Sequence, residues 1–337
     1  MPSSSITRRQ ALSASCWAAS MLAVPVIART APNRLVDVVM TQGVSGLTMH
    51  EVARAQGFFD EFNFQPKVIQ VSDGMKCVAA LISGDAKICM WSGFNQVTPA
   101  IERGAKIKIL AGALNLPSLA MYSAKPEIRK VSDLEGKSVG VGSLGSVLHQ
   151  MTVVLLKKKG VNVDKVRFRN VGSNAEIVRS VSAKTVDAGL SDVDVFDQQK
   201  KFGIHVLPDG MLWKEIPEYT NQGTYASDDA IREDRDTLVR VLAAYGKAYR
   251  FVSGPNSKAA FLKARQKLTG ISDPTQATTQ WNWIQRNQPY ALNLVLSDEQ
   301  INVVQRVNLE FKAQRRVLPV ANVADMSLAK DALKLLK

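Results

Sequence analysis

Short runs of β-branched and apolar residues alternate with segments of helical periodicity along the first third of the chain. The strand-like runs lie at residues 35–40, 66–71, 87–91 and 107–111. The helical segments between them lie at residues 49–62, 74–83 and 96–103. Strands that alternate with helices in this way predict a parallel sheet covered by helices.

The same alternation is repeated further along the chain. Strand-like runs at 138–141, 166–171 and 186–190 are separated by helical segments at 146–159, 175–183 and 193–201. In each half a Gly/Ser loop opens the first helix, and a glycine, Gly57 or Gly160, closes it. A duplicated pattern of this kind predicts two α/β lobes with a common plan.

The connections between the halves suggest where the lobes begin and end. Residues 116–126 contain Pro117 and Pro126 and predict an extended crossover, and residues 216–225 predict a crossover back. Beyond Asp228 the pattern is helical, at residues 236–252, 257–269, 274–287, 297–314 and 325–336. We therefore expect lobe 1 to comprise residues 34–119 and 221–337, with the C-terminal helices packed on it, and lobe 2 to comprise residues 120–220.

The first 28 residues predict an export signal. No acidic side chain occurs in residues 1–31, and Thr7-Arg8-Arg9 precedes a weakly apolar run that ends at Val26-Ile27-Ala28. A basic start, an apolar middle and a small-x-small end are typical of secretory signals, although an amphipathic helix is the alternative. The paired arginines resemble the twin-arginine export motif, with Ala11 where an aromatic residue is common. We expect a periplasmic protein.

Composition excludes several classes of protein. The chain has 337 residues, 46% of them hydrophobic, and only three cysteines and three histidines, which argues against a disulfide scaffold and against a metal site. Cleavage after Ala28 removes Arg8 and Arg9, so the formal net charge falls from +13 to +11. The remaining basic residues are dispersed among acidic ones without interleaved aromatics, so no nucleic-acid partner is expected. We expect no cofactor. Cys77 and Cys89 are expected to be buried free thiols, with a disulfide as the alternative.

Candidate chemistry lies in loops that follow the predicted strands. These loops are rich in Gly, Ser and Asn and occupy residues 42–46, 72–74, 92–95, 142–146, 172–174 and 191–192. The carboxyl ends of parallel strands meet at one edge of a sheet, where ligands bind in open α/β folds. The helix N-termini that follow offer free N–H donors to a polar or anionic group. For any single loop simple helix capping is the better interpretation, and it is the convergence of all six on one cleft that favours a binding site.

Two enzyme signatures are incomplete in this sequence. Gly140-x-Gly142-x-x-Gly145 matches a dinucleotide-binding loop, but the next strand ends Arg169-Asn170-Val171 without the acid that would bind the ribose. The Gly-x-Ser-x-Gly nucleophile motif is absent, and no histidine has an evident orienting acid. The sequence therefore predicts a binding protein and not an enzyme.

Four segments together resemble a known family. They read HEVARAQGFF at 50–59, ALISGDA at 80–86, DLEGKSVGV at 133–141 and VDA at 186–188. In order and spacing they resemble the periplasmic solute-binding proteins of the nitrate/sulfonate/taurine ABC-transporter group, relatives of the thiamine-precursor-binding proteins. The similarity runs from about residue 35 to about residue 262. It implies a two-lobed α/β fold of the type II periplasmic-binding-protein class, a small-molecule ligand and an ABC permease as partner.

The resemblance also implies a set of pocket residues, carried over onto the loops above. They are Ser45, Gly46, Trp91, Ser92, Asn95, Asn115, Ser143, Ser146, Asn174, Asp192 and Tyr225. Trp91 ends a predicted strand and is either a core residue or a wall of the cleft. We expect a wall that stacks on the ligand, so that Trp91→Ala would weaken binding and leave thermal stability nearly unchanged. The loops contain no Lys or Arg, so a guanidinium clamp for an anion is not apparent. Asp73 and Asp192 are expected either to meet an amine or to cap helices.

The function expected from these observations is that of a monomeric periplasmic substrate-binding component of an ABC importer. Its ligand would be a sulfonate, a taurine-like zwitterion or a pyrimidine-type ring, enclosed when the lobes rotate about residues 117–123 and 220–225. One alternative is a ligand-binding sensor subunit. Another is an enzyme related to the pyrimidine synthases of thiamine biosynthesis, whose cysteine-rich motif this sequence lacks.

Overall fold

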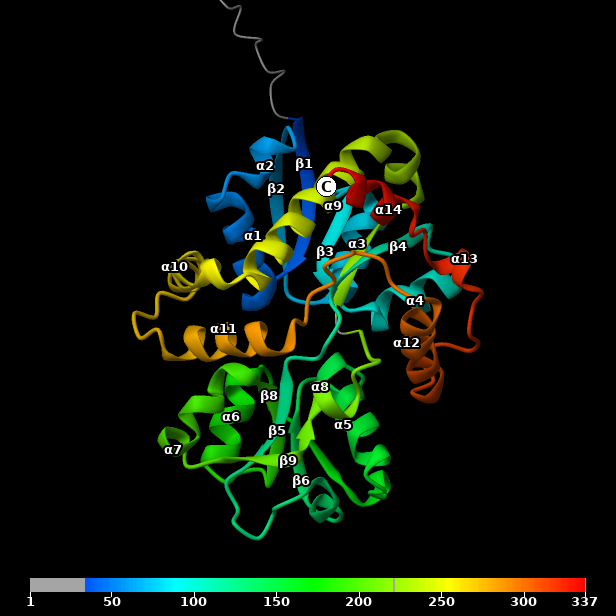
Figure 1. The fold of residues 1–337 in the computed structure, drawn as a ribbon. Helices are drawn as coiled ribbons and strands as arrows, with labels where there is room; N and C mark the ends of the chain where they lie inside the picture. The colour runs from blue at the N-terminus through cyan, green and yellow to red at the C-terminus, as the bar shows by residue number, and fades with distance from the viewer. Residues whose placement is uncertain (1–33, 221, 337) are drawn as a thin grey trace, which may run out of the picture. The chain divides into compact units, whose positions relative to one another are not determined.

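The structure is a computed structural model that describes residues 34–220 and 222–336 (Figure 1). The predicted export signal at residues 1–28 lies outside the described residues. None of the helices within the described ranges is long and apolar enough to cross a membrane.

The first sheet has five strands in the order β2-β1-β3-β10-β4. Their bounds are β1 (Arg34–Thr41), β2 (Phe64–Val71), β3 (Ile88–Ser92), β4 (Ile107–Leu114) and β10 (Gln222–Ser227). β1 pairs in parallel with β2 and β3, whereas β10 runs antiparallel to β3 and β4. Val38, Val39 and Met40 on successive positions of β1 are all fully buried, as expected for a sheet covered on both faces.

The second sheet repeats this plan. Its order is β7-β6-β8-β5-β9, formed by β5 (Leu119–Ser123), β6 (Ser138–Val141), β7 (Arg167–Asn170), β8 (Ala188–Asp192) and β9 (His205–Met211). β6 pairs in parallel with β7 and β8, and β5 is antiparallel to β8 and β9. The predicted α/β fold with two mainly parallel sheets is confirmed. We call the elements on the first sheet lobe 1 and those on the second sheet lobe 2.

The antiparallel strand of each sheet is the first strand formed after the chain passes between the lobes. β5 follows β4 after residues 115–118, and β10 follows α8 (Leu212–Glu215) of lobe 2. The predicted hinge segments were therefore too long, because residues 119–123 and 222–225 are hydrogen-bonded within sheets. The residues outside the strands and helices at the two crossovers are 115–118 and 216–220.

Helices cover both faces of the first sheet. The first group comprises α1 (Val44–Ala55), α2 (Phe58–Glu61), α3 (Gly74–Ser83) and α4 (Phe94–Glu102). The C-terminal group comprises α9 (Asp228–Ser253), α10 (Lys258–Thr269), α11 (Thr275–Asn287), α12 (Asp298–Glu310), α13 (Val320–Val323) and α14 (Ser327–Lys334). α9 packs against α1, α2 and α14, and α12 packs against α4. The expectation that the C-terminal helices pack on lobe 1 is confirmed for α9, α10, α12 and α14, whereas α11 packs mainly against the lobe 2 segment at residues 193–198 and joins the two lobes.

Lobe 2 has fewer long helices. α5 (Val147–Lys158) and α6 (Asn174–Ser182) follow β6 and β7, and each begins at a serine that caps it, Ser146 or Ser173. The helix predicted at 193–201 is instead a 3₁₀ segment, η3 (Val193–Gln198), followed by the single turn α7 (Gln199–Phe202). Gly203, in the left-handed conformation, ends that turn.

Candidate functional site

The three loops at the carboxyl ends of β1, β2 and β3 lie against one another in lobe 1. A Cβ atom added to Gly46 would lie 2.8 Å from the Cβ of Trp91, so the first loop lies directly against the end of β3. A Cβ added to Gly74 would lie 3.1 Å from Oγ of Ser92, which joins the second loop to the third. The chain therefore needs Gly46 for this close approach, and the three predicted loop segments share one edge of the sheet.

The three corresponding loops of lobe 2 also meet. A Cβ added to Gly142 would lie 3.5 Å from the carbonyl oxygen of Gly172. Ser191 Oγ donates to the carbonyl oxygen of Asn174 over 3.1 Å, and Asn174 Nδ2 donates to the carboxyl of Asp192. The loops that follow β6, β7 and β8 are thus linked at the carboxyl edge of the second sheet.

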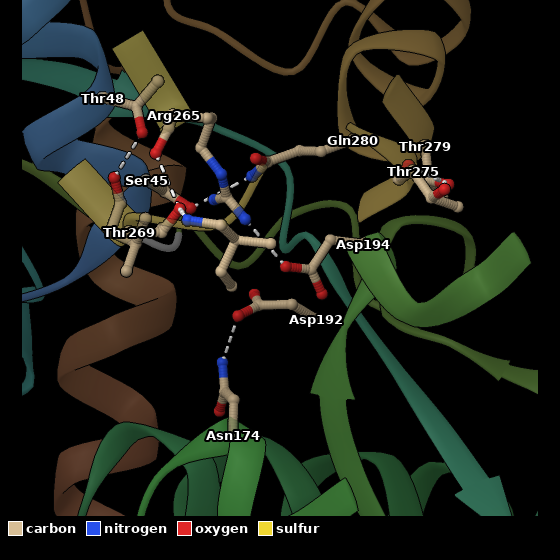
Figure 2. A network of polar contacts seen from close by, with 12 residues as sticks. Ser45, Thr48, Asn174, Asp192, Asp194, Arg265, Thr269, Thr275, Thr279 and Gln280 are labelled. Carbon is tan, nitrogen blue, oxygen red and sulfur yellow. Dashed lines mark hydrogen bonds and ion pairs between the residues drawn. The ribbon is translucent and has the colours of Figure 1, made fainter. Parts of the chain in front are cut away.

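The edges of the two sheets are connected through α10, α11 and η3 (Figure 2). We call this contact between the lobes the first flank. Arg265 Nη2, on α10 of lobe 1, lies 3.0 Å from Asp194 Oδ2, on η3 of lobe 2. Thr279 Oγ1, on α11, donates to Asp197 Oδ2 over 2.7 Å. Within lobe 1, Gln280 Nε2 donates to Ser45 Oγ over 3.1 Å, which attaches α11 to the first predicted loop.

The lobes also meet at a second flank, between α5 and α12. Gln150 Nε2 donates to Asn308 Oδ1 over 3.1 Å, and Asn308 Nδ2 donates to Thr98 Oγ1 over 2.9 Å. The ring of His149 packs edge-on against Phe311, with ring centroids 5.5 Å apart. Two separate sets of side-chain contacts therefore hold the lobes together in this structure.

The surroundings of the carboxyl groups at the first flank shift their pKa values. Burial and the neighbouring charge of Asp194 raise the pKa of Asp192 to about 7, while the hydrogen bond from Asn174 and the charge of Arg265 oppose the rise. Burial also raises the pKa of Asp194, and Arg265 opposes that rise. One guanidinium therefore faces two carboxyl groups, and Asp192 carries a proton over much of the range below neutral pH.

Trp91 corrects one sequence prediction. Its side chain is 1% exposed, its Nε1 donates to Tyr249 OH over 2.8 Å, and its ring lies edge-on to Tyr290 with centroids 5.8 Å apart. The backbone of Trp91 has φ +57° at a register shift between β3 and β10. Trp91 is therefore a core residue in this structure and not an open wall of the cleft.

Several other predicted residues are buried polar groups. Ser92 Oγ, Asn95 Oδ1, Asn115 Oδ1 and Tyr225 OH have no hydrogen-bond partner among the described residues. Buried polar atoms are almost always satisfied in folded proteins, so Asn95 and Asn115 are positions where a ligand or an ordered water would be stabilised. Ser92 and Tyr225 instead lie close to each other and to the buried thiols of Cys77 and Cys89. Tyr225 lies opposite Cys89 in the sheet register and is fully buried.

The remaining predicted residues lie in the loops of the two lobes. Ser45 accepts the hydrogen bond from Gln280, and Asn174 donates to Asp192. Ser146 Oγ accepts from the backbone N–H of His149 and caps α5, and Ser143 is exposed on the same loop. The structure brings Asn174 and Asp192 together and holds Ser45 beside α11.

Arg265, Asp194 and Gln280 were missed by sequence reasoning. The six predicted loops contain no Lys or Arg, whereas Arg265 comes from a helix far along the chain. A local signal was present, because Phe261 and Arg265 are four residues apart on a helix and therefore share a face. An arginine on a buried helical face calls for an acidic partner, which here is Asp194.

The described residues contain no group of three or more His, Cys, Asp and Glu side chains that could hold a metal ion. Cys77 on α3 and Cys89 on β3 are free and buried. Each histidine also has a structural partner. His50 Nδ1 lies 2.7 Å from Tyr245 OH, His149 Nδ1 accepts from the N–H of Gly145, and His205 Nε2 lies 2.7 Å from the carbonyl oxygen of Ile128.

Two mainly parallel sheets of the same strand order, joined by two crossovers, define the two-lobed fold of solute-binding proteins. A family model described as "NMT1/THI5 like" matches residues 47–257. The chain belongs to this NMT1/THI5-like family, in agreement with the resemblance found in the sequence. No curated protein matches the chain.

Solved structures share the fold at low sequence identity. The periplasmic aliphatic sulphonate binding protein SsuA from Escherichia coli has a TM-score of 0.71 and 15% identity, covering 88% of this chain and 92% of its own. The alkanesulfonate-binding protein SsuA from Xanthomonas axonopodis pv. citri, bound to MOPS, has a TM-score of 0.65 and 17% identity, covering 90% and 98%. The desulfurization enzyme DSZB has a TM-score of 0.60 and 15% identity, covering 90% and 100%. The fold therefore occurs in both binding proteins and an enzyme.

Proposed function

We propose that the protein is the periplasmic substrate-binding component of an ABC importer, which captures a small polar organic solute between its lobes. The observation that carries this proposal is the set of polar side chains that the two lobes direct toward each other. Arg265, Gln280 and Ser45 come from lobe 1, and Asp192, Asp194 and Asn174 come from lobe 2 (Figure 2).

The proposed mechanism is closure on the ligand. The contacts between Arg265 and Asp194 and between Thr279 and Asp197 can form only when the lobes are together. A solute that bridges the lobes binds the closed arrangement better than an open one and shifts the population toward it. The crossover at residues 115–118 is short and lies outside both sheets. The N–H groups of Asn115 and Leu116 donate to the carbonyl oxygen of Pro289, and the carbonyl oxygen of Ser118 accepts from Val193. The change in backbone angles on closure is proposed to fall within this segment and residues 216–220.

The comparisons support this role. Both SsuA proteins are named as binders of sulfonates, and the fold of this chain matches theirs over about nine-tenths of its length. Export to the periplasm, as its first 28 residues predict, would place the chain where such proteins work. Sulfonates, taurine-like zwitterions and pyrimidine-type rings are the ligand classes that we carry forward from the sequence.

An enzymatic role has less support from the described residues. A covalent mechanism needs a nucleophile within hydrogen-bond reach of a base. Cys77 on α3 and Cys89 on the central strand β3 are both fully buried. The three histidines bind a tyrosine hydroxyl, a backbone N–H and a backbone carbonyl group. These groups stabilise the fold and are not arranged as a nucleophile with its base.

The test is a thermal-shift screen of the purified protein against sulfonates, amines, aromatic acids and pyrimidines, followed by small-angle X-ray scattering with each hit. A ligand at 100 times its Kd stabilises the folded state by about 2.7 kcal/mol. We expect at least one class of compound to raise the Tm of the wild-type protein. In the variant Arg265→Ala, which loosens the contact between the lobes, we expect the same compound to keep the radius of gyration at the compact value. If no compound of the four classes raises Tm, the proposed function is wrong.

A further inference from the structure

The charges at the first inter-lobe flank are unequal. Arg265 on α10 is the cation of this site, and it is already paired with Asp194 at 3.0 Å, with the two side chains 8% and 16% exposed. Asp192 has no cationic partner within ion-pair distance among the described residues, and its carboxyl accepts only the neutral amide of Asn174. Asp197, which accepts from the Thr279 hydroxyl, is a third carboxyl group of this flank, so the described residues of the flank have one guanidinium for three carboxyl groups.

A second observation concerns hydrogen-bond acceptors. Gln280 on α11 is 5% exposed, and its Nε2 is used in the hydrogen bond to Ser45. Its Oε1 is buried and accepts no hydrogen bond from the described residues. Figure 2 shows the Gln280 side chain reaching toward Arg265. An unsatisfied buried acceptor favours a ligand that brings a donor to this place.

We propose that the solute bound between the lobes presents a protonated nitrogen to Asp192, so that the site selects amine-bearing solutes over sulfonates that lack an amine. This inference rests on the proposed function, because it assigns the ligand class of the same site. An ammonium or amidinium group would supply the missing positive charge and the N–H donors, in charge-assisted hydrogen bonds that are stronger than neutral ones.

A sulfonate without an amine fits the same groups poorly. To reach the guanidinium it would have to compete with Asp194, which already accepts from Arg265, and its negative charge would lie beside Asp192. Breaking a buried ion pair by removing one partner leaves an uncompensated charge, which is strongly unfavourable. A zwitterion such as taurine can bind under this proposal, but through its amine.

The proposal predicts whether ligand binding releases protons or takes them up, and that difference can be measured. The groups that act on the Asp192 carboxyl are Asp194 from η3, Arg265 from α10 and Asn174 from α6. Tyr122 from β5 donates to the backbone carbonyl oxygen of Asp192. Burial and Asp194 raise the pKa of Asp192 to about 7, so the empty site holds part of a proton near neutral pH. A bound cation lowers that pKa and releases the proton, whereas a bound anion raises it and takes up a proton.

The experiment compares matched probes by isothermal titration calorimetry near pH 7, in two buffers of different ionisation enthalpy. The probes are ethylamine, taurine and ethanesulfonate, with benzylamine and benzenesulfonate as larger analogues. We expect each amine-bearing probe to bind at least tenfold more tightly than its amine-free counterpart and to release protons. Asp192→Asn should lower amine affinity by at least tenfold and abolish most of the proton release.

Asp164→Asn is the matched control. Asp164 is an exposed aspartate on η2 (Val163–Lys165), which leads into β7 and therefore lies at the opposite edge of the second sheet. This variant removes the same charge and should leave the affinity of every probe unchanged. Equal or tighter binding of the amine-free sulfonates, with proton uptake and no effect of Asp192→Asn, overturns the inference and leaves the proposed function standing. Failure of all five probes also overturns it, and the broader screen then decides whether the proposed function survives.

Discussion

Arg265 of α10 and Asp194 of η3 form an ion pair between the lobes, with Nη2 and Oδ2 3.0 Å apart. Removing one member of a buried pair costs about 3–5 kcal/mol when the other charge stays buried. Here the lobes can separate and hydrate that charge, so we expect Arg265→Ala to favour an open arrangement. Small-angle X-ray scattering should then show a larger radius of gyration in the absence of ligand.

The control for this variant is Lys263→Ala, which removes an exposed cation two residues away on the same helix. It should leave the scattering profile unchanged. Asp194→Asn should reproduce the effect of Arg265→Ala, and the double variant should open no further than either single variant. Identical profiles for Arg265→Ala and the wild type would show that the ion pair does not hold the lobes together.

Trp91→Ala is expected to destabilise the protein strongly. The indole fills the core between Tyr249 and Tyr290, and large aromatic-to-alanine changes in cores cost about 3–5 kcal/mol. Trp91→Phe keeps a ring and loses the hydrogen bond to Tyr249, which is worth about 1 kcal/mol. Urea unfolding followed by circular dichroism should rank the wild type above Trp91→Phe and Trp91→Phe above Trp91→Ala. A Trp91→Ala midpoint equal to that of the wild type would instead return this residue to the cleft surface.

Trp91 also shows where strand periodicity fails. Alternation along β3 would place Trp91 on the face of Cys89, whose side chain belongs to the core cluster on the α3 and α4 side. The register shift and the left-handed backbone of Trp91 turn it to the other face, beside Ile88 and Met90. A bulge of this kind adds one residue and re-aims a side chain, and nothing in the local sequence announces it.

The sequence predicted those parts of the fold that are determined by residues close to one another in the chain. Strand periodicity, helix caps such as Ser146 and Ser173, and glycines at helix ends are local signals, and they located both sheets and the six loops. The pairing of Arg265 with Asp194 joins residues 71 positions apart in different lobes. Such a contact depends on how α10 packs on α1, which no short window of sequence encodes.

Cys77 and Cys89 should be unreactive in the folded protein. Both side chains have 0% exposure, and burial raises the pKa of the Cys89 thiol further, which reduces its thiolate form. A thiol reagent such as DTNB should count two more reactive thiols in the denatured protein than in the native one. Rapid labelling of either cysteine under native conditions would show that α3 separates readily from β3.

Asp192 and His50 give the stability of the protein opposite dependences on pH. Burial is the main cause that raises the pKa of Asp192 to about 7 in the folded protein. The protonated carboxyl therefore adds stability that is complete below the ordinary pKa of aspartate and is lost as the pH rises through 7. Burial lowers the pKa of His50 to about 4, so its contribution to stability is lost as pH falls from 6.5 toward 4. The two dependences partly cancel in the wild-type protein.

Asp192→Asn separates these two effects, because it removes the carboxyl and leaves His50 in place. We expect the free energy of unfolding of this variant to rise with pH between 4 and 7 relative to that of the wild type. The upper limit of the difference is about 1.4 kcal/mol for each unit of pH. Urea titrations at several pH values measure it, with Asp164→Asn as the variant whose profile should follow that of the wild type. Parallel profiles for Asp192→Asn and the wild type would mean that Asp192 ionises normally, because the lobes in solution leave its carboxyl open to water.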